Sequence, residues 1–372
     1  MNTENFCKIR IAVDRSESRA LLALLKEMRI GYAYMETARS VLLDARTTLR
    51  SVLRNSAAIR EKQTAIVTFL VPGGHARDCL NYLTWRLDID APGKGSITAK
   101  RLERLAAAGG LEAGAPVVGA YEPRIVTEGL TGICCITVKG AGNDVAMVGL
   151  TTGTAVPDIA YGMGTGLRNR LGAWRILIPA EKEVTNLVVH ADEAPSIMEL
   201  MIAAGRLDEP GKGFIFEYPV DLGVLETRFS VGETRHAASM EQLIYAMDEL
   251  RGNTDWRRKG PASSGVPGEG RKYLTGLVDL TLICNEGYCE QLTREAMDAG
   301  AGGATMRRLK YLPLASEARD VSPARETSVM TIPLSMVEKV SEAIVCHGLL
   351  EAAVSGELVM NPVPRALTYL GK

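Results

Sequence analysis

The sequence lacks most of the features that mark specialised classes of protein. No stretch approaches the ~20 apolar residues that a membrane-spanning helix needs. The first ten residues, MNTENFCKIR, lack the basic region and apolar core of a signal peptide. The four histidines and seven cysteines show neither metal-ligand spacing nor a paired framework. We therefore expect a cytoplasmic protein without membrane insertion and without a metal site.

Net charge and catalytic motifs are also scarce. The 43 basic and 44 acidic residues leave a net charge of −1, which does not favour nucleic acid as a partner. Aromatic residues make up 5% of the chain and hydrophobic residues 46%, so the cores must be mainly aliphatic. No nucleophile elbow, Walker lysine-serine pair or dinucleotide fingerprint occurs. These absences predict a protein that is not an enzyme and requires no cofactor.

Glycine, by contrast, is plentiful, with 37 residues, and it recurs in a distinctive loop. DAPGKGSI runs from Asp90 to Ile97, and DEPGKGFI runs from Asp208 to Ile215. Backbone N–H groups of a glycine turn can form a concave anion site, to which a lysine adds charge. Pro-Gly is also a common turn with no ligand. Both interpretations of the loop stay open at this point.

The loops belong to a longer repeat. Landmarks around the second loop recur 143 positions later, where Glu183, Gly205 and Gly213 are matched by Glu326, Gly348 and Gly356. The residues before the first loop show the same strand, helix, loop and strand. A strand at Cys7–Val13, a helix at Ser18–Met28 and a strand at Tyr32–Leu42 precede that copy. Each unit therefore has the order β-α-β-β-α-β.

This pattern predicts the fold class and the domains. The expected fold is α+β, with three ferredoxin-like βαββαβ units in one chain. The predicted units are residues 1–108, 128–235 and 270–372, and the predicted linkers are 109–127 and 236–269. Helices on one face of each sheet leave the other face to be covered, and three sheets can cover one another.

The residues of the second unit resemble the PII signal-transduction family. The resemblance rests on ICCITVK, YGMGTG at 161–166, PAEKEVTNLVVHAD and RLDEPGKGFIFEYPV, in that order. It implies a PII-type pseudo-trimer made by a single chain, with clefts between the units. It also implies nitrogen regulation and signal transduction, with ATP, ADP or AMP as a possible effector and a regulated protein as partner.

The resemblance implies a set of nucleotide-binding residues. They lie in the two loops and at the base of the flexible loop of the second unit: Gly211, Lys212, Gly213, Gly162, Gly164, Gly93, Lys94 and Gly95. In PII the lysine follows the second glycine, whereas Lys94 and Lys212 lie between the glycines. The third copy, VSGEL, keeps only Gly356 and places Glu357 after it. We therefore expect that this glycine serves the fold.

Two other functions remain open from the sequence. One is a scaffold or interaction protein that has kept the ring and lost the ligand. The other is a metal-handling protein of the related copper-tolerance type, since a fold does not determine a function.

Overall fold

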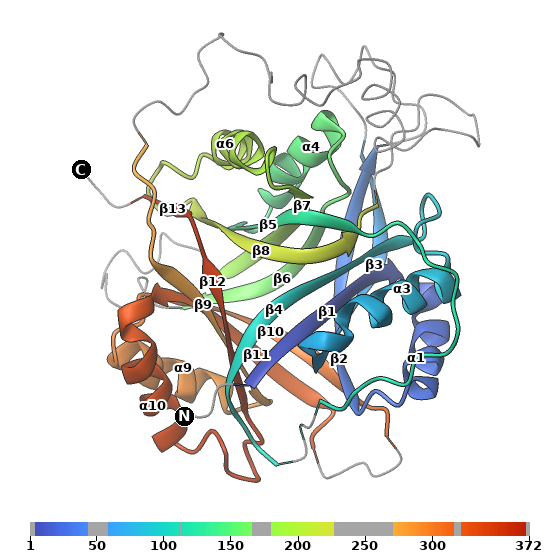
Figure 1. Ribbon diagram of the computed structural model, residues 1–372. Coiled ribbons are helices and arrows are strands. Elements are labelled where there is room, and N and C mark those ends of the chain that lie inside the picture. Colours follow the sequence, from blue (N-terminus) through green and yellow to red (C-terminus); the bar gives the residue numbers. More distant parts are fainter. Residues whose placement is uncertain are drawn as a thin grey trace.

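The structure is a computed structural model that describes residues 4–43, 59–109, 111, 113–165, 180–226, 271–315 and 321–369. The order strand, helix, strand, strand, helix, strand occurs three times within these residues. Figure 1 shows the strands at the centre and the helices around them. The predicted linker 236–269 lies outside the described residues.

The helices and strands form three groups along the chain. The first group contains β1 (Glu4–Asp14), α1 (Ser18–Glu27), β2 (Tyr32–Leu43), β3 (Ile59–Pro72), α3 (Ala76–Leu87) and β4 (Gly95–Ala107). The second contains β5 (Thr127–Val138), α4 (Gly142–Thr152), β6 (Asp158–Thr165), β7 (Glu181–His190), α6 (Ala194–Gly205) and β8 (Gly213–Val224). The third contains β9 (Leu277–Asn285), α9 (Cys289–Asp298), β10 (Ala304–Pro313), β11 (Ala324–Pro333), α10 (Val337–Cys346), β12 (Glu357–Val363) and β13 (Ala366–Thr368). Short 3-10 turns precede three of the helices: η1 (Arg15–Glu17), η2 (Gly73–His75) and η4 (Leu334–Met336).

The named strands form one antiparallel sheet that closes on itself. Their order is β10-β11-β9-β12-β4-β1-β3-β2-β6-β7-β5-β8-β13. Strands of different groups pair at the borders: β12 with β4, β2 with β6, β8 with β4, and β10 with both β2 and β6. The result is a closed antiparallel barrel of 10 strands, and strand makes up 46% of the structure.

The expected fold class, three ferredoxin-like α+β units in a PII-type pseudo-trimer, is therefore wrong. The repeat in the sequence reports the local order of elements, which is the same for separate units and for one barrel. An edge strand has unpaired N–H and C=O groups, and pairing between groups removes those edges. The expectations of nitrogen regulation and nucleotide binding that came with the PII-type fold lose their structural basis.

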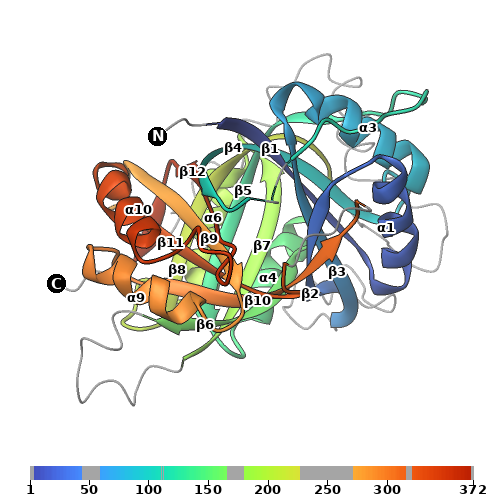
Figure 2. The ribbon, with the colours of Figure 1, turned by 90° about the horizontal axis from the view of Figure 1, so that it is seen from below.

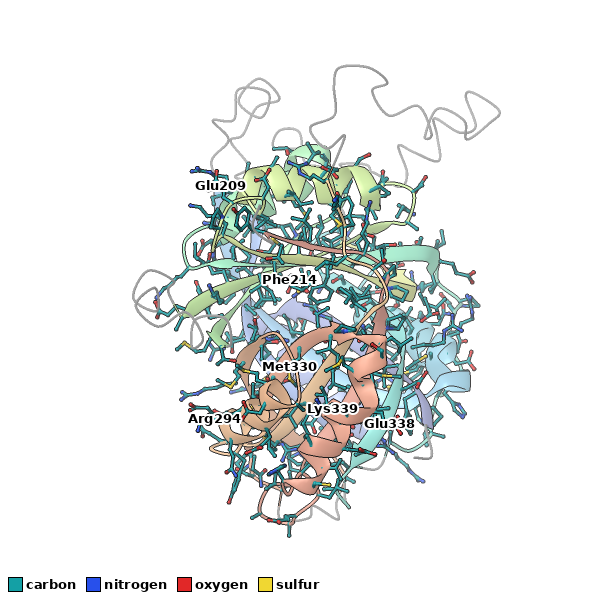
Figure 3. The ribbon with its side chains drawn as sticks, turned by 90° about the vertical axis from the view of Figure 1, so that its left-hand side faces the viewer. Glu209, Phe214, Arg294, Met330, Glu338 and Lys339 are labelled. Atoms are coloured by element: carbon teal, nitrogen blue, oxygen red, sulfur yellow. The ribbon has the colours of Figure 1, made fainter. Side chains whose placement is uncertain are left out.

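The helices cover the outside of the barrel. Figures 1 and 2 show α1 and α3 on one side, α9 and α10 on the opposite side, and α4 and α6 over a third. In α10, Val340 and Ile344 are fully buried against the strands, whereas Glu338 and Lys339 are exposed. Figure 3 shows these two charged residues outside the buried Met330 of β11. Each helix pair thus shields one outer face of the sheet.

Strand periodicity explains which residues face the helices. In β1, Cys7, Ile9 and Ile11 pack into a core with residues of α1 and α3. Lys8 and Arg10 alternate with them and therefore face the inside of the barrel. No helix in the described part of the chain is long and apolar enough to cross a membrane.

Candidate functional site

The glycine that ends each repeated loop is required by packing. A Cβ atom at Gly95 would lie far inside van der Waals contact with the carbonyl oxygen of Ala12, and one at Gly213 would do the same with Ile136. At Gly356 the corresponding obstacle is Leu349. Since all three loops share this close approach, the structure confirms that the glycine serves the fold.

The two loop lysines make few contacts. The Nζ of Lys94 lies 3.5 Å from a carboxylate oxygen of Glu17, and both side chains are about half exposed. The backbone N–H groups of Lys94 and Lys212 donate to Ala91 and Glu209 within their own turns. These two N–H groups are therefore not directed toward a ligand. Phosphate binding by Gly93, Lys94, Gly95 and their counterparts stays a prediction.

Gly162 and Gly164 lie on β6, where they contribute to barrel closure. Gly164 pairs with Thr305 of β10, and a Cβ atom at Gly162 would come within 3.0 Å of the Met306 carbonyl oxygen. The strand register places Gly213, Thr137, Glu183 and Tyr161 in one row across four neighbouring strands. Three strand spacings separate Gly213 from Tyr161 by about 14 Å. The structure does not bring these predicted site residues together within the second group.

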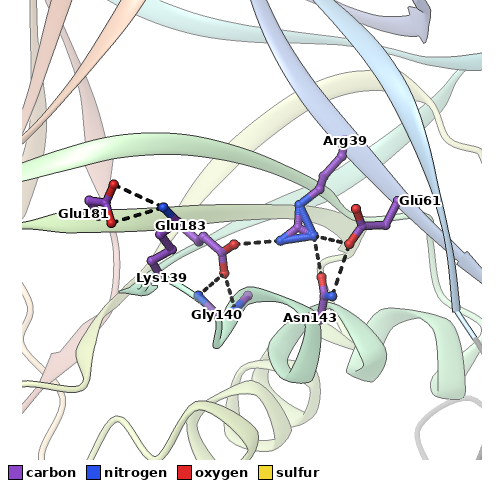
Figure 4. Close-up of polar contacts among 8 residues, drawn as sticks. Arg39, Glu61, Lys139, Gly140, Asn143, Glu181 and Glu183 are labelled. Atoms are coloured by element: carbon purple, nitrogen blue, oxygen red, sulfur yellow. Dashed lines mark hydrogen bonds and ion pairs between the residues drawn. The ribbon is translucent and has the colours of Figure 1, made fainter. Parts of the chain in front are cut away.

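An ion cluster that is buried at Arg39 and Glu183 and half exposed at Glu61 joins the first two groups near Tyr161, and Figure 4 shows it. Arg39 of β2 donates to Glu183 of β7 at 2.8 Å, to Glu61 at 2.7 Å and to Asn143 at 2.6 Å. The second carboxylate oxygen of Glu183 accepts from the N–H groups of Gly140 and Gly142. We call Arg39, Glu61, Asn143 and Glu183 the Arg39 cluster. Its charges are paired across the border between the two groups, although the Nε of Arg39 is buried without a hydrogen bond among the described residues, so its role is to join the two groups.

The inside of the barrel forms a different kind of site. A cavity of about 110 Å³ is lined by alternate residues of ten strands, drawn from all three groups. The wall from the second group is largely apolar and includes Ile136, Val184, Phe216 and Val220. The walls from the first and third groups carry the charged side chains. The cavity is therefore polar on one side and apolar on the other.

Basic side chains outnumber acidic ones around this cavity. Lys8, Arg10, Lys100 and Arg307 border it, together with the carboxylates of Glu36 and Asp279. The two arginines are paired. Arg10 donates to Asp158 at 2.6 Å, and Arg307 donates to both oxygens of Glu36 at 2.7 and 2.8 Å. Asp158 and Glu36 thus neutralise the two arginines. Among the described residues around the cavity, Asp279 is the one carboxylate left for Lys8 and Lys100, so one positive charge has no negative charge to balance it when both lysines are protonated.

The two lysines lie side by side. Lys8 of β1 is directly opposite Lys100 of β4 in the antiparallel register. Such pairs have Cβ atoms ~5 Å apart, and like charges there repel. Lys100 donates to Asn361 at 2.9 Å and lies 4.4 Å from the ring centre of Tyr218. Within the described residues, the Lys8 amine has no hydrogen bond and no ion pair.

The surroundings lower the pKa of both lysines. Burial lowers the pKa of Lys8 to about 7, and the neighbouring Lys100 and Arg307 add to this effect. Burial also lowers the pKa of Lys100. Desolvation raises the pKa of Cys134 to about 12 and raises the pKa of Tyr218, so neither supplies a negative charge near pH 7. An uncharged Lys8 therefore brings the free barrel into charge balance.

Two polar groups at this site lack partners as well. The hydroxyl of Thr327, which lines the cavity, and the amide nitrogen of Asn361, whose oxygen accepts from Lys100, are buried without a hydrogen bond among the described residues. Buried polar groups in native proteins nearly always have partners. These two atoms and the Lys8 amine lie on the polar side of the cavity.

The sequence analysis missed this site, although the sequence carries a signal for it. Charged residues alternate with apolar ones inside predicted strands, as in CKIRIAV at 7–13. If other sheets cover the second face of each strand, Lys8 and Arg10 must be enclosed. The expectation that the sheets cover one another thus already implies enclosed charges on β1.

Neither a metal site in the described part of the chain nor a known family is found. No group of three or more His, Cys, Asp or Glu side chains within the described residues could hold a metal ion. A scan against protein-family models finds no match, and a search of curated proteins finds none either. The resemblance to the PII family gains no support from these comparisons.

Proposed function

We propose that the protein binds a small organic anion inside its barrel. The observation that carries this proposal is the Lys8 amine, which borders the cavity beside Lys100 and makes no hydrogen bond or ion pair with any described residue. An unpaired charge inside a protein is strongly unfavourable. The free barrel avoids that cost where Lys8 is uncharged, and an anionic ligand would let Lys8 take up a proton and would supply the matching negative charge.

The volume and the walls limit the ligand. A cavity of about 110 Å³ has room for roughly four water molecules at the ~30 Å³ that each occupies in the liquid, and so for a compact compound of only a few carbon atoms. An adenine nucleotide is larger than this. The apolar wall around Ile136, Val184 and Phe216 suits a short hydrocarbon chain. The ligand class that best fits is a short branched carboxylate, with its carboxylate toward Lys8 and Lys100.

Other expectations from the sequence are kept as proposals. One expectation is that the protein binds a ligand without catalysing a reaction. A second is that it regulates a protein partner. Both agree with a cavity that selects one small compound. A reducing compartment such as the cytoplasm agrees with seven free cysteines, of which six are buried.

Calorimetry with 3-methylbutanoate at pH 6.5 tests the proposal. We expect a dissociation constant on the order of 0.1 mM, typical of a good ligand of this size. Lys8→Met should weaken binding at least about tenfold, because the principal partner of the carboxylate is lost. Lys212→Met makes the same substitution in an outer loop and should change nothing. No binding by the wild type, or equal binding by Lys8→Met, would overturn the proposal.

A further inference from the structure

We propose that Lys8 captures a short 2-oxo acid covalently, as an imine formed inside the barrel. This inference rests on the proposed function, since the carboxylate of the 2-oxo acid occupies the same anion site. It adds a chemical role for the amine itself, which the binding of a simple carboxylate does not require.

The geometry supplies a nucleophile with few competing contacts. The Lys8 amine borders the cavity and has no hydrogen bond or ion pair within the described residues, so no contact must break before it attacks. The charged groups that face it come from five other strands and from its own, and they are Arg10, Glu36, Lys100, Asp158, Asp279 and Arg307. Three of them are cations and three are carboxylates, so burial, more than net charge, favours an uncharged amine, with Lys100 and Arg307 adding to the effect.

At pH 7 a large share of Lys8 carries no proton, because its pKa is lowered to about 7. An ordinary lysine with a pKa near 10.4 is uncharged in only about one molecule in a thousand or fewer. The carboxylate of a 2-oxo acid would raise this pKa on binding, which opposes attack. Arg10 and Arg307, already paired with carboxylates, limit that rise by keeping positive charge near the amine.

The reaction balances with groups that line or adjoin the cavity. The Lys8 amine attacks the carbonyl carbon, a C–N bond forms, and one amine proton moves to the carbonyl oxygen. Lys100, directly opposite Lys8, then gives a proton to this hydroxyl group, which leaves as water. The positive charge thereby passes from Lys100 to the iminium group. Nothing is oxidised or reduced, so no further reactant is needed.

The walls also favour a branched 2-oxo acid over other carbonyl compounds. The carboxylate lies toward the lysines and Arg307, the carbonyl carbon lies next to the Lys8 amine, and the alkyl chain lies toward Phe216 and Val220. A 2-oxo acid carries its carbonyl group next to its carboxylate, so both can reach the same wall. A neutral aldehyde lacks the carboxylate and should be captured poorly.

Reductive trapping tests the inference. The full-length protein is incubated at pH 7 with 3-methyl-2-oxobutanoate and sodium cyanoborohydride, and the modified peptide is identified by mass spectrometry. We expect one adduct, on Lys8, that forms at least about tenfold faster than adducts on other lysines. Lys8→Met and Lys8→Gln should abolish it, Lys212→Met should not, and 2-hydroxy-3-methylbutanoate should slow it.

The outcomes separate the inference from the proposed function. If 2-hydroxy-3-methylbutanoate binds by calorimetry but no Lys8 adduct forms, covalent capture is wrong and anion binding stands. If neither binding nor an adduct is found, both are wrong. Equal labelling of many lysines in the wild type and in Lys8→Met would mean that only chemical background is seen, and it would also overturn the inference. Thermal unfolding of both variants checks that they are folded.

Discussion

The Arg39 cluster and the charged side chains that line the barrel cavity differ in how completely their charges are paired among the described residues. In the Arg39 cluster, Arg39 is held by two carboxylates and an amide, and Glu183 accepts two backbone N–H groups as well. Around the barrel cavity the arginines are paired, but the Lys8 amine makes no hydrogen bond or ion pair with the residues that the structure describes. The Arg39 cluster joins two parts of the sheet, and the charged side chains of the cavity surround an open volume.

The difference in pairing distinguishes charged residues that stabilise the fold from charged residues that bind a ligand. A buried charge that serves the fold needs a partner, because unpaired burial is strongly unfavourable. Lys8 lowers the stability of the protein in the absence of a ligand, so stability does not explain why a lysine occupies this position. Binding of an anion supplies one. The predictions below test this contrast, from the largest expected effect to the smallest.

Arg39→Ala should cause the largest loss of stability. Glu183, whose side chain is 4% exposed, would keep its two backbone contacts but lose its cation. Removing one partner of a buried pair typically costs about 3–5 kcal/mol. Urea unfolding measures the effect. Arg294→Ala is the control, since its pair with Glu290 is exposed and worth about 0.5 kcal/mol or less. Equal effects of the two changes would contradict the structural role of the cluster.

Gly95→Ala should cost about 3 kcal/mol. The new Cβ atom collides with the Ala12 carbonyl oxygen, and the backbone of Gly95 has a φ of 137° that alanine rarely adopts. Gly74→Ala is the matched change, because no atom lies within 4 Å of a Cβ atom there. Thermal unfolding compares the two variants. A stable Gly95→Ala protein would show that the close approach is not needed.

Lys8→Met should stabilise the ligand-free protein by about 2 kcal/mol near pH 6. Between its folded pKa of about 7 and its unfolded value of 10.5, the folded chain binds fewer protons at Lys8 than the unfolded chain does. The contribution of Lys8 to stability therefore improves as pH rises through this range. The advantage of Lys8→Met should be largest below pH 7 and small near pH 10. Chemical unfolding at several pH values measures it, and an advantage that does not change with pH would contradict the account.

Lys212→Ala and Lys94→Ala should change stability by less than about 0.5 kcal/mol. Lys94 makes one exposed ion pair, and such pairs contribute little. The same two variants should bind 3-methylbutanoate as the wild type does. A clear loss of ligand binding would place the site in the loops rather than in the barrel.

The sequence predicted local structure better than global arrangement. The strands expected at Cys7–Val13 and Tyr32–Leu42 occur as β1 and β2, and the helix expected at Ser18–Met28 occurs as α1. Periodicity and turn residues act over short distances, so they were sufficient there. Pairing between β10 and both β2 and β6 depends on residues more than 100 positions apart. No local pattern encodes such pairing, and the barrel was therefore missed.

The site was missed for a related reason. The repeated loops drew attention because their identity is visible in the sequence, and their glycines are explained by packing against Ala12 and Ile136. The cavity residues share no motif, since Lys8, Lys100 and Arg307 come together only when the barrel closes.

Proton uptake during anion binding tests the central claim most directly. Calorimetric titration of the wild type with 3-methylbutanoate at pH 8, in buffers of different ionisation enthalpy, counts the protons taken up. At this pH most of the free Lys8 carries no proton, and a bound carboxylate should raise its pKa. We predict an uptake that approaches one proton per anion, and none for Lys8→Met. Tight binding without proton uptake by the wild type would contradict the account.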